Sequence, residues 1–198
     1  MAQGGLEMEQ QSGPARRGQQ AMRVVLVTGP LGVGKSTLIE GLGRIYSRRK
    51  AAVLDGDALS MTYPGGTSTG RLNLVEENLF SCAQNFRDWG AEYLFMAWIF
   101  ARQGRLDHFV DRLVEQDIGV MVVSLCASTK ARDDRLQKRD RAHNFDPDTQ
   151  RWLELLHEST LKLKTDMLID TSHMNAYEVM NHVADRLARW ESRIPVHQ

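Results

Sequence analysis

The stretch "TGPLGVGKST", residues Thr28–Thr37, decides the fold of this chain. From Gly29 to Ser36 it contains the full pattern G-x-x-x-x-G-K-[ST]. The residues before it, Met22–Gly29, are apolar and rich in β-branched side chains, which predicts a strand buried on both faces. Apolar residues at helical spacing predict a helix over Lys35–Tyr46. A buried strand, this pattern and then a helix form the context in which the pattern binds phosphate groups.

The residue types in this loop suit a nucleoside triphosphate. Glycines permit backbone angles that a side chain would forbid, so several N–H groups can point inward at an anion. The start of the helix adds its positive dipole end. Lys35 is expected to reach the β- and γ-phosphates, Ser36 to ligate Mg²⁺ and Thr37 to touch the α-phosphate. The alternative, a glycine-rich turn with a chance lysine, is disfavoured by the complete pattern in this context. ATP and Mg²⁺ are therefore the predicted ligands, and the loop residues expected to hold them are Gly29, Gly32, Val33, Gly34, Lys35, Ser36 and Thr37.

The rest of the chain continues the alternation of strand and helix. Further buried strands are expected at residues 51–55, 91–100, 119–126 and 166–170. Further helices are expected at residues 72–89, 106–116, 129–141, 149–163 and 176–190, with a loop at residues 63–70. Five buried strands alternating with helices require a parallel sheet covered on both faces, with right-handed crossovers. The predicted fold is an α/β three-layer sandwich with a five-stranded parallel sheet, of the P-loop nucleoside triphosphate hydrolase/kinase type.

Composition limits the domain organisation and the partners. Residues 1–21 are rich in Gly, Gln and Ser and are expected to form a disordered leader to one domain, residues 22–198, with a lid around residues 129–146. No secretory h-region or membrane-spanning apolar run occurs, and neither Cys82 nor Cys126 lies in a metal-binding pattern, so a cytoplasmic protein is expected. Lys and Arg (25) balance Asp and Glu (25), which disfavours a nucleic-acid-binding surface. A homodimer is compatible with the sequence, which does not determine the oligomeric state.

A pair of carboxylates follows the second expected strand, in "LDGD" at residues 54–57. Phosphoryl transfer to an alcohol needs a metal ion held in place and a group that accepts the hydroxyl proton. Asp55 could orient Mg²⁺, and Asp57 could act as the base and position the acceptor. An ordinary polar turn is the alternative, because Asp-Gly is a common turn pair. The phosphate loop expected at the same sheet edge favours the functional interpretation.

A phosphate loop followed by a strand that ends in "DGD" resembles the small-molecule kinases of the P-loop class, adenylylsulfate kinase most directly and shikimate and gluconate kinases more distantly. In those families the two aspartates match Asp55 and Asp57, in the roles given above. The segment "GRLNLVEENLFSCAQNFRDWGAEYLFMAWIF" resembles the part of adenylylsulfate kinase in which an Arg and an Asn face the acceptor, and Arg71 and Asn78 are the nearest counterparts. The spacing to Gly90 and the arginine pattern differ from that family, so the acceptor stays open.

A highly charged helix is expected after the fourth strand, in "STKARDDRLQKRDRAHN". Arg132, Arg135 and Arg139 share one face by their helical spacing. P-loop kinases place a lid with arginines at this point, so the resemblance implies that Arg135 and Arg139 close over ATP and neutralise charge on the transferring phosphoryl group. A solvated helix with i, i+4 ion pairs is the alternative.

Two further residue groups could contribute to binding. Trp98 is expected near the carboxyl end of the third strand, where it either packs in the core or lines the acceptor pocket. "DTS", residues 170–172, ends the last strand near the expected position of an adenine ring and is a weaker candidate contact.

Together these features predict an ATP-dependent kinase that phosphorylates a hydroxyl group of a small molecule. The acceptor could be a sulfated nucleotide, a nucleoside, a sugar acid or an antibiotic. The predicted catalytic residues are Lys35, Asp57, Arg135 and Arg139, the predicted acceptor-binding residues are Asp57, Arg71 and Asn78, and the predicted metal-binding residues are Ser36 and Asp55. A regulatory P-loop NTPase is one alternative, although the chain has no Asn-Lys-x-Asp motif after the fourth strand and no Asp-x-x-Gly switch. A polynucleotide 5′-kinase is another, although it would need a basic channel.

Overall fold

The computed structural model describes residues 22–63, 69–138 and 147–191. The expected leader at residues 1–21 lies outside the described residues. The same is true of residues 139–146, which include Arg139 and most of the second half of the expected lid.

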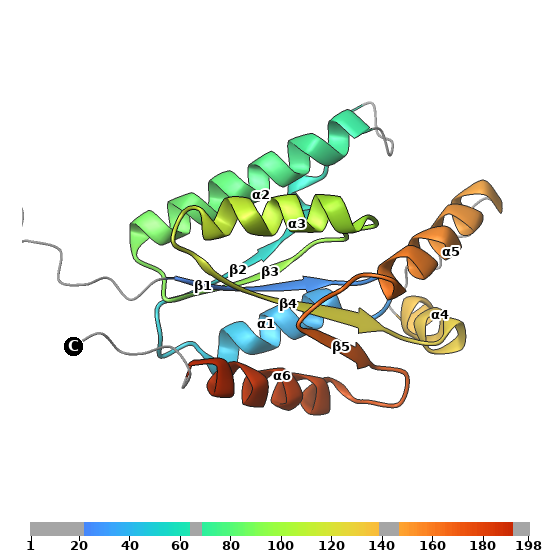
Figure 1. Ribbon diagram of the computed structural model, residues 1–198. Helices are drawn as coiled ribbons and strands as arrows, with labels where there is room; N and C mark the ends of the chain where they lie inside the picture. Colours follow the sequence, from blue (N-terminus) through green and yellow to red (C-terminus); the bar gives the residue numbers. More distant parts are fainter. Residues whose placement is uncertain (1–21, 64–68, 139–146, 192–198) are drawn as a thin grey trace, which may run out of the picture.

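A parallel sheet forms the centre of the domain (Figure 1). Its strands are β1 (Arg23–Thr28), β2 (Ala51–Asp55), β3 (Tyr93–Ala97), β4 (Gly119–Cys126) and β5 (Met167–Asp170). They are arranged in the order β2-β3-β1-β4-β5, and every neighbouring pair is parallel. The prediction of a five-stranded parallel sheet is therefore confirmed, with the phosphate loop following the central strand.

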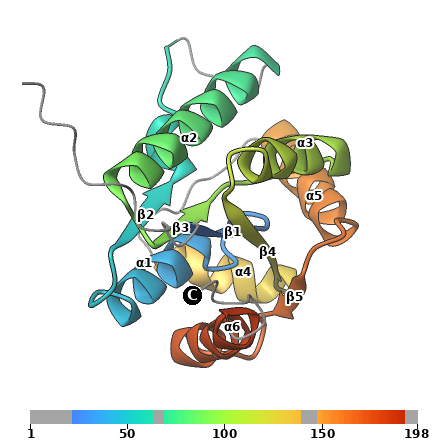
Figure 2. The same cartoon turned by 60° about the vertical axis from the view of Figure 1, so that its left-hand side comes forward.

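Helices cover both faces of the sheet. They are α1 (Lys35–Ile45), the short 3₁₀ helix η1 (Gly56–Leu59), α2 (Thr69–Trp89), α3 (Gln103–Val114), α4 (Thr129–Lys138), α5 (Pro147–Leu161) and α6 (Ala176–Glu191). The helices α2 and α3 lie on one face and α1 and α6 on the other, while α4 and α5 lie toward the carboxyl ends of the strands (Figures 1 and 2). Across the described residues, every helix is too short or too polar to cross a lipid bilayer.

The core consists of two apolar layers, one on each side of the sheet. All six residues of β1 are buried, because helices shield both faces of a central parallel strand. Alternate β1 residues point to opposite layers. Val25 and Val27 pack with the α1 and α6 side, whereas Val24 and Leu26 pack with the α2 and α3 side. A fully buried side chain of this kind contributes roughly 1.5–3 kcal/mol to folding. This burial on both faces holds β1 in place in the sheet, and the phosphate loop begins directly after its last residue, Thr28.

Several expected boundaries were wrong, and α3, for example, begins at Gln103 rather than at residue 106. Strand β3 ends at Ala97 rather than at Phe100, because the backbone N–H of Phe100 donates to the side-chain Oγ1 of Thr28 at 3.1 Å and draws the chain out of the sheet. Helix α2 begins at Thr69, within the stretch predicted to be loop, and α5 begins at Pro147, which is a favourable first helical residue. The end of α2 agrees with the prediction, since Gly90 adopts a φ of 85°.

Candidate active site

The phosphate loop depends on three glycines with left-handed backbone angles. Gly29, Gly32 and Gly34 have φ values of 142°, 82° and 101°. Side chains other than hydrogen rarely tolerate such angles. Gly34 is the residue before α1, so the loop leads directly into the positive end of that helix.

Gly29 is also constrained by its surroundings. A Cβ at this position would lie 2.3 Å from the carbonyl oxygen of Leu125 on β4. We expect Gly29→Ala to lower the free energy of unfolding by at least about 2 kcal/mol and to abolish nucleotide binding, because the loop must move to relieve both the clash and the backbone strain. Urea unfolding and calorimetry with Mg·ATP would measure the two effects.

The matched control for Gly29→Ala is Gly104→Ala in the first turn of α3, where an added Cβ meets no atom within 4 Å. We expect this variant to bind Mg·ATP normally and to be up to about 1 kcal/mol more stable, since alanine favours a helix. Normal binding by Gly29→Ala would contradict the proposed tight packing of the loop against β4.

The side chain of Lys35 folds over the loop. Its Nζ donates to the carbonyl oxygens of Gly29 at 2.9 Å and Pro30 at 3.1 Å. Phosphate oxygens would compete with these two carbonyl oxygens for the ammonium protons. The anion-binding role expected for Lys35 stays a prediction.

A short hydrogen bond joins the phosphate loop to the carboxyl end of β2. The Ser36 hydroxyl donates to Oδ2 of Asp55 at 2.6 Å, and Oδ1 of the same carboxylate accepts the backbone N–H of Asp57 at 3.0 Å. Asp55 thereby caps η1 and holds the following turn, while the side chain of Asp57 is exposed. The fold thus brings Ser36, Asp55 and Asp57 together, although 21 residues separate the first from the last.

The residues at this junction fit a magnesium ion. Mg²⁺ prefers oxygen ligands and is usually bound by one or two protein oxygens together with substrate phosphates and water. The Ser36 hydroxyl and the Asp55 carboxylate supply such oxygens beside the loop.

Trp98 supports the Asp-Gly-Asp turn from behind. A Cβ on Gly56 would lie 2.5 Å from Cε3 of the Trp98 ring, so the ring packs directly on the glycine backbone. Trp98 is 4% exposed. Of the two alternatives for this residue, the structure favours core packing. The Trp98 ring therefore limits how closely the turn that carries Asp57 can approach β3.

The two acceptor-site candidates on α2, Arg71 and Asn78, lie two turns apart on the helix. The Nε and Nη2 atoms of Arg71 donate to the carbonyl oxygen of Ser60 at 3.0 Å and 2.7 Å. These two hydrogen bonds tie the start of α2 to the segment after η1. Asn78 is half-buried and lies two turns later, roughly 10 Å along the helix axis.

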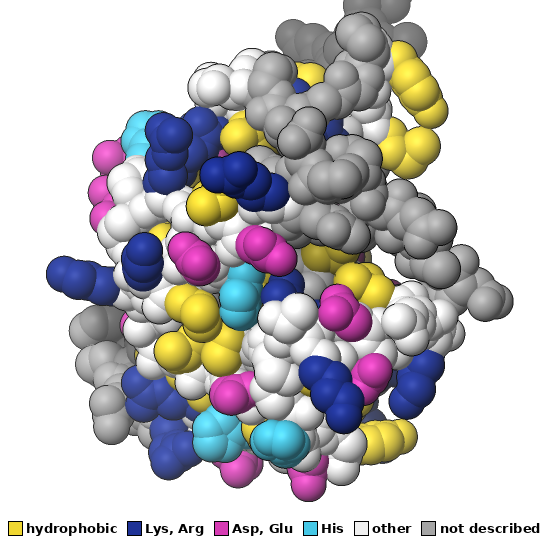
Figure 3. Space-filling view, turned by 90° about the vertical axis from the view of Figure 1, so that its right-hand side faces the viewer, with side chains coloured by type: hydrophobic (Ala, Val, Ile, Leu, Met, Phe, Trp, Pro, Cys, Tyr) yellow, Lys and Arg dark blue, Asp and Glu magenta, His cyan; other side chains and the backbone are white. Residues whose placement is uncertain are grey.

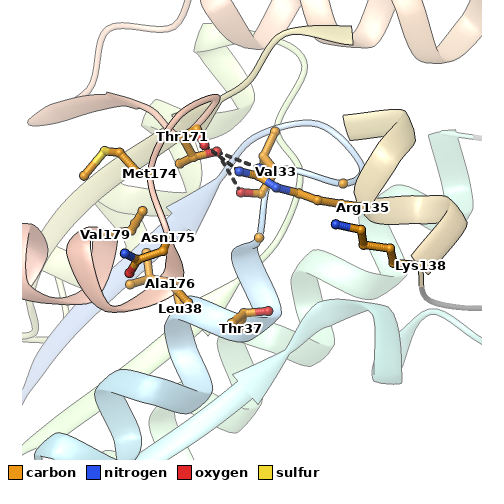
Figure 4. Close-up of a pocket in the computed structure, with 12 residues that line it drawn as sticks. Val33, Thr37, Leu38, Arg135, Lys138, Thr171, Met174, Asn175, Ala176 and Val179 are labelled. Atoms are coloured by element: carbon orange, nitrogen blue, oxygen red, sulfur yellow. Dashed lines mark hydrogen bonds between the residues drawn. The ribbon is translucent and has the colours of Figure 1, made fainter. Parts of the chain in front are cut away.

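A cavity of about 350 Å³ lies between the phosphate loop, α4 and the start of α6 (Figure 4). Arg135 projects from α4 across one wall, where its Nη1 donates to Oγ1 of Thr171 at 2.9 Å. That hydroxyl also lies 3.2 Å from the carbonyl oxygen of Val33 in the loop. Thr37, expected at the α-phosphate, lines the same cavity. The structure therefore places Arg135 in the wall of a cavity that Gly34 and Thr37 also line, and the role expected for Arg135 at the transferring phosphoryl group stays a prediction.

Sequence reasoning missed the opposite wall of this cavity. It is formed by two residues before α6 and two in its first turn: Met174, Asn175, Ala176 and Val179. One signal was present. The Asn175 side chain accepts the backbone N–H of Glu178 at 3.1 Å, and the Glu178 carboxylate accepts the backbone N–H of Asn175 at 2.7 Å. This reciprocal cap marks where α6 begins, but only the fold brings that point next to the loop.

Arg132, on the same helix as Arg135, supports the loop from outside. It is 7% exposed, and a Cβ on Gly32 would lie 3.2 Å from the Cβ of Arg132. Burial and, to a smaller extent, the Arg132 charge lower the pKa of His157 on α5. A buried arginine here adds positive potential behind the phosphate loop.

The face at the carboxyl ends of the strands carries mixed charge (Figure 3). In the part of this face formed by described residues, Lys and Arg side chains alternate with Asp, Glu and hydrophobic side chains and do not gather into one patch.

No protein-family model and no curated protein matches this chain in sequence. Several solved structures match its fold. The APS kinase of Mycobacterium tuberculosis, solved with AMPPNP and APS, aligns with a TM-score of 0.63 at 19% identity, over 85% of this chain and 98% of the other. A gluconokinase from Sinorhizobium meliloti aligns with a TM-score of 0.60 at 16% identity, over 88% and 95%. The shikimate kinase of Aquifex aeolicus aligns with a TM-score of 0.57 at 16% identity, over 87% and 100%.

The fold is that of the P-loop kinases. The resemblance to adenylylsulfate (APS), gluconate and shikimate kinases predicted from the phosphate loop and "DGD" is thus confirmed at the level of architecture. The alignments cover 85% to 88% of this chain and 95% to 100% of these three P-loop kinases.

Proposed function

We propose that this protein is an ATP-dependent kinase that transfers the γ-phosphoryl group to a hydroxyl of a small molecule. One observation carries the proposal: the hydrogen-bonded path from Ser36 through Asp55 to Asp57, which joins the phosphate loop to an exposed carboxylate at the next strand end. The P-loop kinase fold supports it, as does the neighbouring APS kinase structure that contains AMPPNP and APS.

In the proposed reaction, the phosphate-loop amides and Lys35 hold the triphosphate with its γ-phosphate toward the Asp-Gly-Asp turn. Asp57 accepts the proton of the acceptor hydroxyl, and the hydroxyl oxygen forms a bond to the γ-phosphorus. The bond from that phosphorus to the β,γ-bridging oxygen breaks, and its electron pair leaves with ADP. Ser36 and Asp55 would hold Mg²⁺, which neutralises phosphate charge when bound.

The nucleoside would occupy the cavity between α4 and α6. Its position beside Gly34 and Thr37 supports this assignment, because those residues are expected near the α-phosphate. Arg135 and Thr171 would contact the nucleoside end of ATP, in line with the weaker expectation for "DTS". Arg139 stays a candidate for the lid.

Two other functions are less well supported. A regulatory NTPase would bind or hydrolyse the nucleotide without a carboxylate positioned for an alcohol, whereas here the Asp55 carboxylate bonds both to the Ser36 hydroxyl and to the backbone N–H of Asp57. A polynucleotide 5′-kinase would need a basic track, and the described part of the strand-end face has mixed charge.

A screen with γ-labelled ATP tests the proposal. Nucleosides, nucleotides, sugars, sugar acids and hydroxylated antibiotics would be incubated with the protein and Mg²⁺. We expect label transfer to at least one class, and ATP hydrolysis at least tenfold slower without an acceptor than transfer with it, because site closure excludes water. Fast hydrolysis that no acceptor changes would instead support the NTPase.

A further inference from the structure

We propose that the acceptor is an uncharged or cationic hydroxyl compound with an apolar part, rather than an anion such as a sugar acid or a nucleotide. This inference rests on the proposed kinase function. It follows from the charges around Asp57, at the edge of the sheet where η1, α2 and α3 begin.

Among the described residues, two cations at this edge, Arg71 and Arg105, are already engaged by the protein. Arg71 directs two nitrogens at the carbonyl oxygen of Ser60. Arg105, in the first turn of α3, places its Nε 3.0 Å and its Nη2 2.8 Å from Oε1 of Glu76 on α2, and the Glu76 side chain is only 12% exposed. A guanidinium with these partners is poorly able to bind a carboxylate or phosphate of a substrate.

The carboxylates at this edge are less fully compensated. Asp57 is exposed, and Asp55 accepts one hydroxyl and one backbone N–H. An anionic acceptor would therefore lie between Asp57 and the triphosphate, and this repulsion would grow as the closing site excludes water.

Apolar side chains border the same edge. Met61 and Tyr63, in the segment that follows η1, are 78% and 92% exposed, and Leu74, one turn after Arg71 on α2, is 47% exposed. In this proposal, these three exposed residues provide hydrophobic contact area for the apolar part of the acceptor. A compound with an apolar part and no negative charge would bind these apolar side chains and would avoid repulsion by Asp57.

Matched acceptor pairs test the proposal directly. Each pair would share the hydroxyl groups and differ in the anionic group: D-gluconamide and D-gluconate, methyl shikimate and shikimate, 5′-deoxyadenosine and AMP. Kanamycin and chloramphenicol would represent cationic and apolar hydroxyl compounds. In any pair that is phosphorylated, we expect kcat/KM to be at least tenfold higher for the uncharged member than for the anionic member. If only the antibiotics are phosphorylated, we expect their kcat/KM to be at least tenfold higher than that of every anionic compound. A preference for the anionic members would overturn the inference and leave the kinase proposal intact, whereas no transfer to any compound would overturn both.

A charge-changing variant adds a second test. Glu76→Gln releases the Arg105 guanidinium at the acceptor edge, so kcat/KM for an anionic acceptor should rise about tenfold while that for its uncharged partner stays within about twofold. The control is Glu77→Gln, which releases Arg112 two turns further along α3. We expect neither acceptor type to respond to it. Unchanged acceptor preference in folded Glu76→Gln, checked by thermal melting, would show that this ion pair does not set the charge of the site.

Arg102 provides the opposing test. Its side chain is exposed at the residue before α3, where it is available to an anion. We expect Arg102→Ala to leave phosphorylation of the preferred acceptor within about twofold. A tenfold rise in KM for the acceptor, with unchanged affinity for ATP, would indicate an anion held by Arg102 and would overturn the inference.

Discussion

Replacing Lys35 with alanine is expected to lower kcat/KM for phosphoryl transfer by about 10³-fold. The ammonium group lies over the phosphate loop, within 3.1 Å of two loop carbonyl oxygens. It is therefore placed to meet the charge that develops between the β- and γ-phosphates. Transfer from γ-labelled ATP would measure the kinetic effect, and calorimetry with Mg·ATP would measure the accompanying loss of affinity.

Lys50→Ala is the matched control for Lys35→Ala. Lys50 precedes β2 at the opposite end of the sheet, and its ammonium lies 4.3 Å from the centre of the Trp89 ring. This variant removes one lysine charge without touching the loop and should transfer phosphoryl groups normally. If Lys35→Ala kept more than a tenth of the original kcat/KM, the loop would not be the phosphate-binding element that we propose.

Asp57→Asn is the second change with a large expected effect. An amide has nearly the same shape as a carboxylate but is a far weaker proton acceptor, so kcat should fall by about 10²–10⁴-fold. Affinity for Mg·ATP should stay within about twofold, because the metal-side contact between Ser36 and Asp55 is preserved. Single-turnover transfer and equilibrium nucleotide binding, measured on the same preparation, separate the two effects.

The control for Asp57→Asn is Asp185→Asn, an exposed residue in the second half of α6, away from the carboxyl ends of the strands. It should alter neither transfer nor binding. Near-normal transfer by Asp57→Asn would exclude Asp57 as the base. Equal losses of ATP affinity and transfer would instead indicate that Asp57 acts mainly on the nucleotide.

The fold could be predicted because its signals are local. β-branched runs such as Arg23–Thr28 favour strands buried on both faces, and helical spacing in Lys35–Ile45 is visible without knowing what the helix contacts. Alternation of such segments leaves few topologies other than a covered parallel sheet. The phosphate loop was predictable for the same reason, since all of its groups come from ten consecutive residues, Thr28–Thr37.

Boundaries were less predictable where a distant residue decides them. Strand β3 stops at Ala97 because Thr28, on β1, accepts the N–H of Phe100. The local sequence "AWIF" is as apolar as the strand before it and contains no stop signal. Tertiary hydrogen bonds therefore overrode a local preference at this point.

The partners of the site residues were also undetermined by sequence. The bond from Arg135 to Thr171 spans 36 residues, and the contact between Thr171 and Val33 spans 138. Similarly, the sequence suggested Arg71 as an acceptor ligand but could not indicate that its guanidinium binds the Ser60 carbonyl. Charge in a sequence shows what a side chain can bind, while only its neighbours determine what it does bind.

The amino-acid sequence by itself determined an α/β fold with a parallel sheet and a loop of the phosphate-binding pattern. Apolar strand runs, helical periodicity and the glycine pattern can each be recognised within a short segment of the chain. Only the tertiary structure decided that Asp55 bonds to Ser36, that the Trp98 ring packs on Gly56, and that Arg71 and Arg105 are engaged by the Ser60 carbonyl and Glu76. These contacts join elements far apart in sequence, and their geometry depends on how helices and strands pack against one another.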